Sequence, residues 1–356
     1  MINSTIYAGV RCILAFLKSR VGYMNRADMK SFEIELNAYA KINLALYVLS
    51  RRTDGYHDIK SFMQGINIFD TLKIKTKIIN NYNYNCFFAE TNIYLFSTNK
   101  NIPLTADNLA VKGAESVIEA ISSRCNFADL MNERGADCIS IEIDKKLPVA
   151  AGIAGGSGNA ATVMLGVNHL LGNPLSMREL MEVGVKVGAD VPFSIMMNAY
   201  LNADKLVGLP KLGEASSAGI VSGIGEVVEA AEPRPYFVIL FNPGIAVSTK
   251  EVYEAIDRKL EGANYAQREV DISLFYNDLE LYTLANYEEV QSLVSRIREN
   301  LQADEVLMSG SGPTVAAYYT DYTRFEADYE ALESAGWVEP TWRYWKTKSG
   351  GHDLWS

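Results

Sequence analysis

The chain has 356 residues, of which 48% are hydrophobic and 21% charged, and its formal net charge is -10 at pH 7. This composition is typical of a globular protein long enough for two packed domains. The acidic balance and the lack of a dense Lys/Arg stripe argue against nucleic acid as a partner. An anionic small molecule is still compatible with this charge, because helix N-termini and a bound Mg²⁺ supply local positive potential.

The four cysteines and three histidines are widely spaced, with neither a paired metal-ligand spacing nor a dense disulfide framework. We therefore expect free thiols in a reducing cytoplasm and no zinc site. No segment reaches the roughly 18 uninterrupted apolar residues of a membrane span. The sequence thus predicts a cytoplasmic protein that does not enter the membrane.

The first part of the chain begins with strand-like alternation, which places Lys41 and Asn43 on the same face. A turn signal, Thr53-Asp54-Gly55, leads to further strand material. A helical pattern then covers 108–121, and an alternating strand covers 139–143. This part is therefore expected to mix a β-sheet with helices.

The second part of the chain alternates helix and strand patterns. A buried helix is expected over 160–171, and Ser176 and Glu179 have the capping-box spacing that starts another helix. Further on, the patterns predict a strand and two helices, at 236–241, 250–260 and 287–300. The fold class expected for the whole chain is α+β.

A run of small residues lies between a predicted strand and a predicted helix. From Ala150 to Ala161, every residue except Ile153 is Gly, Ala, Ser or Asn. Small side chains allow backbone N–H groups to approach a ligand, and the following helix directs its positive end at an anion. A close-packed turn is the structural alternative, but the length of the run favours a phosphate-binding loop.

Two common phosphate-binding loops can be excluded. The chain has no Gly-Lys-Ser or Gly-Lys-Thr, so it lacks a Walker-type loop. Residues Gly156 to Ala161 match the dinucleotide pattern G-x-G-x-x-A, but a helix containing Glu179 is expected where that fold needs a second strand. We therefore reject a dehydrogenase.

Three other features have a simple structural explanation when each is taken alone. Asp190 can cap a helix that has Pro192 in its first turn, and Lys41 can be a solvated strand lysine. The cluster from Ser309 to Thr314 can be a tight hairpin turn.

Together and in order, five segments resemble the motifs of the GHMP kinases, the superfamily of galactokinase, homoserine kinase, mevalonate kinase and phosphomevalonate kinase. These segments are Asn37–Leu44, Asp54–His57, Leu147–Ala161, Gly188–Pro192 and Ser309–Thr314. The resemblance extends from about residue 34 to about residue 335. The first two segments resemble the members that act on an alcohol linked to cytidine diphosphate.

The resemblance implies a two-domain GHMP kinase fold, with an N-terminal domain like domain 2 of ribosomal protein S5 and a ferredoxin-like C-terminal domain. The expected division is an extension at 1–33, an ATP-binding domain at 34–197, an insertion at 198–216, a second domain at 217–347 and a tail at 348–356. The insertion is hypothesised to form a lobe at the rim of the active site; a neutral surface excursion is the alternative. A monomer or weak homodimer is expected.

The resemblance also implies an activity. The 2-hydroxyl of a methylerythritol unit carried on cytidine diphosphate would be phosphorylated by ATP with Mg²⁺, in the non-mevalonate route to isoprenoid precursors. Asp190 would accept the hydroxyl proton, and Lys41 would keep Asp190 ionised and offset charge on the transferring phosphoryl group. On the substrate side, Tyr56 would stack on cytosine, His57 would hydrogen-bond it, and Asn43, Thr249 and Tyr253 would line the pocket.

The same resemblance implies the ATP side of the site. These residues are Asn108, Lys112, Pro148, Gly152, Ile153, Ala154, Gly155, Gly156, Ser157, Gly158, Asn159, Gly310, Ser311 and Gly312. Asn108 can equally cap the helix that it precedes.

The phosphate-binding loop departs from the family pattern. Ala150, Ala151 and Ala154 stand where glycine is common, and Gly158 stands where a second serine is common. A methyl group disfavours positive φ angles, which predicts weaker or altered nucleotide binding. Ser157 is then the serine candidate for Mg²⁺ in this loop.

Two alternatives are kept. The chain could be another GHMP kinase acting on mevalonate or a sugar, or a non-catalytic descendant that binds a nucleotide and regulates a partner. Tyr56 and His57 favour a cytosine-containing substrate over the first alternative. Retention of both Lys41 and Asp190 argues against the second, because a pure binding protein needs no base.

Overall fold

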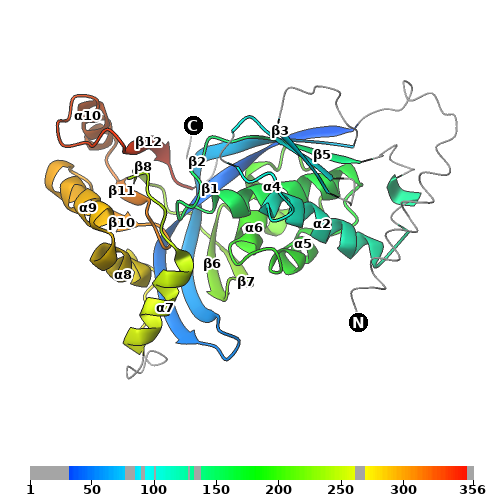
Figure 1. Cartoon of the computed structure of the whole chain (residues 1–356), viewed down its shortest axis with the longest axis horizontal. Coiled ribbons are helices and arrows are strands. Elements are labelled where there is room, and N and C mark those ends of the chain that lie inside the picture. Colours follow the sequence, from blue (N-terminus) through cyan, green and yellow to red (C-terminus); the bar gives the residue numbers. More distant parts are fainter. Residues whose placement is uncertain are drawn as a thin grey trace.

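The computed structural model describes residues 32–76, 85–89, 93–99, 102–126, 129–131, 138–260 and 269–350. Nearly all of the expected N-terminal extension and most of the expected tail lie outside these residues. The described part of the chain contains an eight-stranded and a four-stranded sheet, each with helices packed against it (Figure 1). This arrangement confirms the expected α+β class.

The larger sheet is built on an antiparallel pair of long strands, β1 (Glu33–Arg51) and β2 (His57–Lys75). β2 also pairs antiparallel with β5 near its C-terminal end and with β6 near its N-terminal end. The remaining strands of this sheet are β3 (Asn85–Ala89), β4 (Ile93–Ser97), β5 (Ile139–Asp144), β6 (Ala218–Gly223), β7 (Val227–Ala231) and β9 (Tyr276–Asn277).

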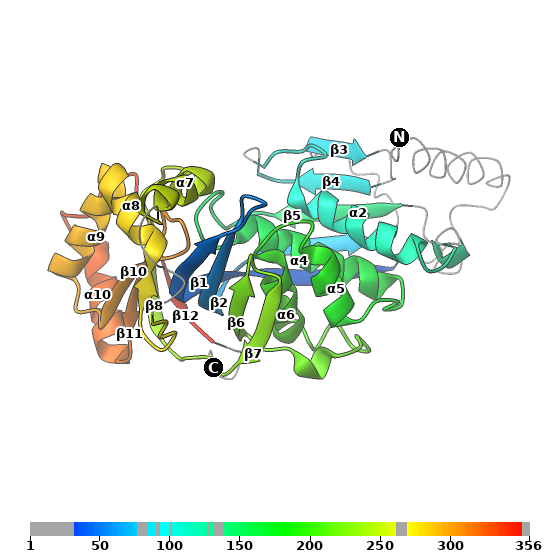
Figure 2. The ribbon, with the colours of Figure 1, turned by 90° about the horizontal axis from the view of Figure 1, so that it is seen from below.

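A layer of helices covers one face of this sheet (Figures 1 and 2). Its members are α2 (Leu109–Ser122), α4 (Gly155–Leu170), α5 (Met177–Gly184) and α6 (Val191–Leu201). α4 is the centre of the layer and is buried along nearly its whole length. Its small residues permit this, since a Cβ added at Gly166 would lie 2.3 Å from Cδ1 of Ile74 on β2.

The smaller sheet has the strand order β10, β11, β8, β12, and all of its pairs are antiparallel. The strands are β8 (Phe237–Asn242), β10 (Glu305–Met308), β11 (Val315–Tyr319) and β12 (Arg343–Lys348). Its associated helices are α7 (Thr249–Leu260), α8 (Asp278–Asn286), α9 (Glu288–Asn300) and α10 (Tyr322–Leu332), and a short 3-10 turn η1 (Leu212–Glu214) lies elsewhere in the chain. Throughout the described residues, none of the helices is both long and apolar enough to cross a bilayer.

Most expected elements form where the patterns place them, and two differences are informative. α4 begins at Gly155, whereas the pattern predicted a start near residue 160. Burial between the sheet and the neighbouring helices overrides the low helix propensity of glycine in this first turn. α8 was not predicted, because its exposed and buried residues do not follow a clear amphipathic stripe.

The segment 198–216 does not form a lobe at the active-site rim, so that hypothesis is wrong. α6 continues into it, Asn198 and Asn202 bond to the backbone of β1, and the backbone N–H of Met177 on α5 donates to the carbonyl of Pro210. None of its residues lines the main cleft described below. After it, β6 and β7 join the larger sheet through β2, and β9 joins it through β1, so this sheet includes strands beyond the expected division at 216/217.

The predicted capping box at α5 is confirmed. The Ser176 hydroxyl accepts from the backbone N–H of Glu179, and the Glu179 carboxylate accepts from the backbone N–H and hydroxyl of Ser176. These bonds, together with the Arg124 guanidinium, lower the pKa of Glu179 to about 2. Since the pKa is lowered in the folded state, the carboxylate stabilises the fold above pH 4.5 and loses this effect as the pH falls toward 2.

This cap predicts a pH-dependent stability difference. Glu179→Gln should lower the free energy of unfolding at pH 7 by about 0.5–1 kcal/mol, because solvent reaches the carboxylate and weakens its charge interactions. The difference from wild type should shrink as the pH is lowered from 4.5 toward 2. Urea unfolding at several pH values measures the difference in free energy of unfolding. Glu182→Gln, on the exposed side of the same helix, is the control. A loss of stability in Glu179→Gln that does not depend on pH would contradict the role of the Glu179 charge in the cap.

Candidate active site

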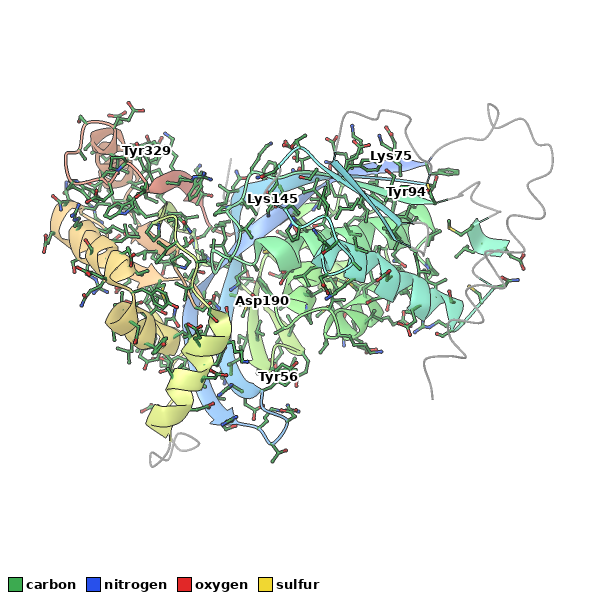
Figure 3. All side chains as sticks on the ribbon, viewed as in Figure 1. Tyr56, Lys75, Tyr94, Lys145, Asp190 and Tyr329 are labelled. Atoms are coloured by element: carbon green, nitrogen blue, oxygen red, sulfur yellow. The ribbon has the colours of Figure 1, made fainter. Side chains whose placement is uncertain are left out.

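A cleft of about 580 Å³ lies where the larger sheet and its helices meet the part of the chain that carries the smaller sheet. In Figure 3, Lys145 and Asp190 lie close to the middle of the molecule, and Tyr56 lies further toward the free end of the β1–β2 hairpin. The predicted site residues that line the cleft are Lys41, Asn43, Asn108, Gly152, Ala154, Gly155, Gly156, Ser157, Asn159, Asp190, Thr249, Tyr253, Gly310, Ser311 and Gly312.

The floor of the cleft contains a buried ammonium group. Lys41 on β1 is only 3% exposed, and its Nζ donates to Asn43 Oδ1 at 2.7 Å and to the carbonyl oxygen of Gly152 at 3.4 Å. Its Nζ also lies 3.6 Å from Asp190 Oδ2. The pattern of β1, in which Lys41 and Asn43 share a face, therefore produces a charged centre and not a solvated strand lysine.

Asp190 stands at the N-cap position of α6, but its side chain makes no capping hydrogen bond. Pro192 in the first turn lacks an N–H that a cap would have to satisfy. The carboxylate is 34% exposed and faces both the Lys41 ammonium and the cleft. A carboxylate that is paired on one side and open on the other can accept a proton from a bound hydroxyl group.

The small-residue loop ends at an uncapped helix N-terminus. Ala154 is the N-cap of α4 and provides no side-chain hydrogen bond, so the first N–H groups of the helix have no side-chain acceptor. Gly155, Gly156 and Ser157 in this first turn all line the cleft. The side chain of Asn159 is 5% exposed, and its Oδ1 has no hydrogen-bond partner within the described structure.

Two alanines of this loop adopt positive φ angles, which a methyl side chain disfavours. Ala150 and Ala154 have φ angles of 52° and 56°, and Gly152 between them has a φ of 74°. L-residues pay a steric cost in this left-handed region that glycine does not. Ala150 and Ala154 therefore carry backbone strain in this loop.

The glycine cluster Ser309–Thr314 packs directly against the small-residue loop at Gly152. The Ser309 hydroxyl donates to the carbonyl oxygen of Gly152, and a Cβ added at Gly152 would lie 2.3 Å from the carbonyl oxygen of Ser309. The Asn277 amide donates to the carbonyl of Gly310, and the hydroxyls of Thr249 and Ser311 are 2.8 Å apart. The cluster is a turn between β10 and β11, as its simple reading predicted, and it also forms one wall of the cleft.

The hairpin side of the cleft contains an aromatic wall. Tyr253 on α7 lines the cleft, and its ring stacks on the His57 ring with centroids 4.8 Å apart and an interplanar angle of 30°. Burial, followed by the negative charges of Asp190 and Asp278, raises the pKa of Tyr253. Tyr56 is 59% exposed in the hairpin turn.

Six predicted site residues do not line the cleft: Tyr56, His57, Lys112, Pro148, Ile153 and Gly158. The carbonyl of Ile153 accepts from the backbone N–H of Lys41 and so joins the loop to β1. Asn108 lines the cleft and also caps α2, since its Oδ1 accepts from the N–H of Ala110. Lys112 pairs with Asp107 near the start of the same helix.

Lys145 is a cleft residue that the sequence analysis missed. Its ammonium pairs with the fully buried Asp70, whose other oxygen accepts from the N–H groups of Lys146 and Leu147. A Cβ added at Gly155 would lie 3.1 Å from Lys145 Nζ, so this cation borders the first turn of α4. Its position two residues before the Leu147-Pro148 motif was the available signal.

Other cleft residues that the sequence analysis did not indicate include Asp107, Ile224, Gly225, Val247 and Leu279. No group of three or more His, Cys, Asp or Glu side chains is arranged to hold a metal ion in the described ranges.

Comparisons with known proteins agree with this geometry. Residues 108–198 match the GHMP kinases N terminal domain. The 4-diphosphocytidyl-2-C-methyl-D-erythritol kinase of Alkaliphilus metalliredigens is 34% identical over 312 residues, which cover 84% of this chain and 92% of the relative. The enzyme of the same name from Geobacter metallireducens is 36% identical over 299 residues, covering 81% and 89%.

Solved structures show the same relationship. A crystal structure of 4-(cytidine 5'-diphospho)-2C-methyl-D-erythritol kinase superposes with a TM-score of 0.60 at 25% identity, covering 89% of this chain and 100% of that one. Mevalonate kinase from L. major in complex with R-mevalonate shares the fold alone, with a TM-score of 0.53 at 13% identity and coverage of 91% and 98%. The expected GHMP kinase fold is thereby confirmed.

The fold and the cleft define a small-molecule kinase of the GHMP class. Within that class, the extent and level of identity decide the family. The chain belongs to the 4-diphosphocytidyl-2-C-methyl-D-erythritol kinases.

The strain at Ala154 predicts that a substitution by glycine stabilises the protein. Ala154→Gly should raise the free energy of unfolding by about 0.5–1 kcal/mol, because relief of the left-handed strain exceeds the added entropy of the unfolded chain. Ala151→Gly is the matched control, since Ala151 is buried in the same loop without a positive φ, and it should destabilise the protein. Thermal and urea unfolding compare the two; equal effects would show that Ala154 carries no strain.

Proposed function

We propose that this chain uses ATP to phosphorylate the 2-hydroxyl of 4-diphosphocytidyl-2-C-methyl-D-erythritol, a step in the non-mevalonate synthesis of isoprenoid precursors. The observation that carries the proposal is a single cleft in which the Lys41–Asp190 pair faces the uncapped N-terminus of α4. A base for a hydroxyl group and a cradle for phosphate are thus side by side, which is what phosphoryl transfer to an alcohol needs.

Asp190 is the proposed base. Its carboxylate accepts the proton of the substrate hydroxyl as the oxygen attacks the γ-phosphorus and the bond to the β-phosphate oxygen breaks. The Lys41 ammonium, buried 3.6 Å away, favours the ionised carboxylate and offsets negative charge on the transferring group. Asn43 holds this ammonium in place through the bond between Nζ and Oδ1.

The ATP phosphates are proposed to lie over the first turn of α4. Gly155, Gly156 and Ser157 line the cleft in the first turn of α4, where backbone N–H groups have no intrahelical acceptor, and the Lys145 ammonium adds positive charge beside Gly155. The turn at Gly310 to Gly312 covers the loop from the other side. Asn108 and Lys112 are proposed to serve the adenosine end.

Mg²⁺ is proposed to enter as part of the ATP co-substrate. The donors suited to it are the Ser157 hydroxyl and the unpaired Asn159 Oδ1, since a hard cation prefers such oxygen ligands. When bound, Mg²⁺ neutralises phosphate charge in the transition state. The Ser157 hydroxyl lies 4.0 Å from the position of a Cβ added at Gly188, two residues before the proposed base.

The cytidine part of the substrate is proposed to bind at the aromatic wall. Tyr253 lines the cleft and its ring stacks on the His57 ring, and Thr249 and Asn43 line the same cleft. Tyr56, an exposed aromatic residue in the adjoining turn, is available to cover a base bound there. Aromatic rings are suited to this task because every nucleobase has a π-face.

A turnover assay tests the function. Purified protein is incubated with ATP, Mg²⁺ and, separately, 4-diphosphocytidyl-2-C-methyl-D-erythritol, mevalonate, homoserine or galactose, and ADP release is followed. Turnover is expected only with the first alcohol, and EDTA should abolish it. Turnover with another alcohol alone would indicate a different GHMP kinase. A folded protein that turns over none of them would be a non-catalytic descendant.

The base assignment makes a separate prediction. Asp190→Asn should lower kcat by about 10³-fold, because the amide cannot accept the proton, while ATP binding measured by calorimetry stays nearly unchanged. Asp204→Asn, an exposed position just beyond α6, is the control and should keep full activity. Retention of wild-type kcat in Asp190→Asn would show that another group is the base.

A further inference from the structure

We infer that Asp257 is a positioning residue that fixes the nucleobase wall of the cleft by holding His57 against Tyr253. The inference deepens the proposed function and rests on it, because it concerns the site proposed for the cytidine group. Asp257 lies on α7 outside the cleft, and none of the sequence motifs includes it.

The contacts of Asp257 join α7 to both strands of the hairpin. Its Oδ1 lies 2.6 Å from Nε2 of His57 on β2, and its Oδ2 lies 3.3 Å from Nη1 of Arg51 on β1. Arg51 and His57 are directly opposite each other in the β1–β2 register. The carboxylate therefore binds a cross-strand pair with its two oxygens, at the end of the hairpin where Figures 1 and 2 both place α7.

The hydrogen bond to Asp257 sets the orientation of the His57 ring. A carboxylate only accepts, so Nε2 carries the proton that it donates. The side chains of His57 and Asp257 are 7% and 13% exposed, so water competes little for this bond. The ring is thereby held in one plane and one tautomer, with its face toward Tyr253.

The orientation of the His57 ring affects the cleft through Tyr253, whose ring stacks on it. Tyr253 precedes Asp257 by four residues, so both side chains project from the same face of α7. The His57 ring covers one side of the Tyr253 ring, with the centroids 4.8 Å apart, while Tyr253 also lines the cleft. The wall proposed to contact the nucleobase therefore has three layers. Tyr253 lines the cleft, His57 stacks on Tyr253, and Asp257 holds His57 through a hydrogen bond.

Loss of Asp257 is expected to loosen this wall and leave the phosphate side intact. The His57 ring would lose its acceptor, and Tyr253 would lose a rigid backing ring. Within the described part of the chain, no hydrogen bond or ion pair joins His57, Tyr253 or Asp257 to the loop 150–157 or to Lys41. Binding of the cytidine-linked alcohol should suffer, whereas the affinity for ATP and the chemical step should not.

Steady-state kinetics test the inference. Asp257→Ala should raise KM for 4-diphosphocytidyl-2-C-methyl-D-erythritol about tenfold and change kcat and KM for ATP less than about twofold. Asp257→Asn keeps the volume and an oxygen that accepts from Nε2–H, so it should raise the same KM only about threefold. Glu254→Gln, an exposed carboxylate on the same helix, is the matched control and should behave as wild type.

Ring NMR gives a second readout that does not require turnover. The chain has three histidines, so the long-range ¹H–¹⁵N spectrum contains few ring signals. In wild type, one set should show a single tautomer protonated at Nε2, and Asp257→Ala should convert it to a mixture of tautomers. Asp257→Asn keeps an oxygen acceptor, so it should show a smaller loss of the Nε2-protonated form, and this intermediate loss tests the inference if the alanine variant does not fold.

The outcomes separate the two proposals. Wild-type protein that fails to turn over the cytidine-linked alcohol would overturn the proposed function, while the ring spectra would still decide whether Asp257 orients His57. Wild-type turnover with an unchanged substrate KM in Asp257→Ala would overturn the inference alone. An equal rise of KM for ATP would overturn it as well, because it would indicate a general structural defect.

Discussion

The structure of the cleft depends on the burial of one positive charge. An ammonium group removed from water is unstable unless oxygen atoms replace its hydration. Around Lys41 these oxygens come from three places in the chain: Asn43 on the same strand, Gly152 in the small-residue loop and Asp190 at the start of α6. Satisfying this one group therefore brings together the segments that form the proposed base and the phosphate cradle.

Close backbone contacts add to this constraint. The carbonyl of Gly152 receives both the Lys41 ammonium and the Ser309 hydroxyl, so the two glycine-rich turns meet at one atom. No side chain fits at Gly152, and the neighbouring alanines Ala150 and Ala154 adopt left-handed conformations to preserve the path of the loop. Strain of this kind persists where the surrounding contacts overdetermine the backbone, and it is common at functional sites.

The cleft separates two tasks in space. Charge is concentrated at Lys41, Lys145 and the helix start, where phosphates are proposed to bind, and aromatic surface is concentrated at Tyr253 and His57. The first group depends on the larger sheet and its helices. The second depends on α7 meeting the hairpin, and the carboxylate of Asp257 spans that junction. A substrate that joins a nucleobase to an alcohol needs both.

The sequence by itself determined the elements and the chemistry that are encoded in neighbouring residues. Strand alternation placed Lys41 beside Asn43, the capping box set the start of α5, and ordered motifs indicated the small-residue loop and Asp190, which line the same cleft. Only the tertiary structure decided which distant groups meet: β6 with the larger sheet, Lys145 with the start of α4, and Asp257 with His57. Local patterns report periodicity and backbone preference, whereas these pairings depend on burial and charge contacts between residues far apart in the chain.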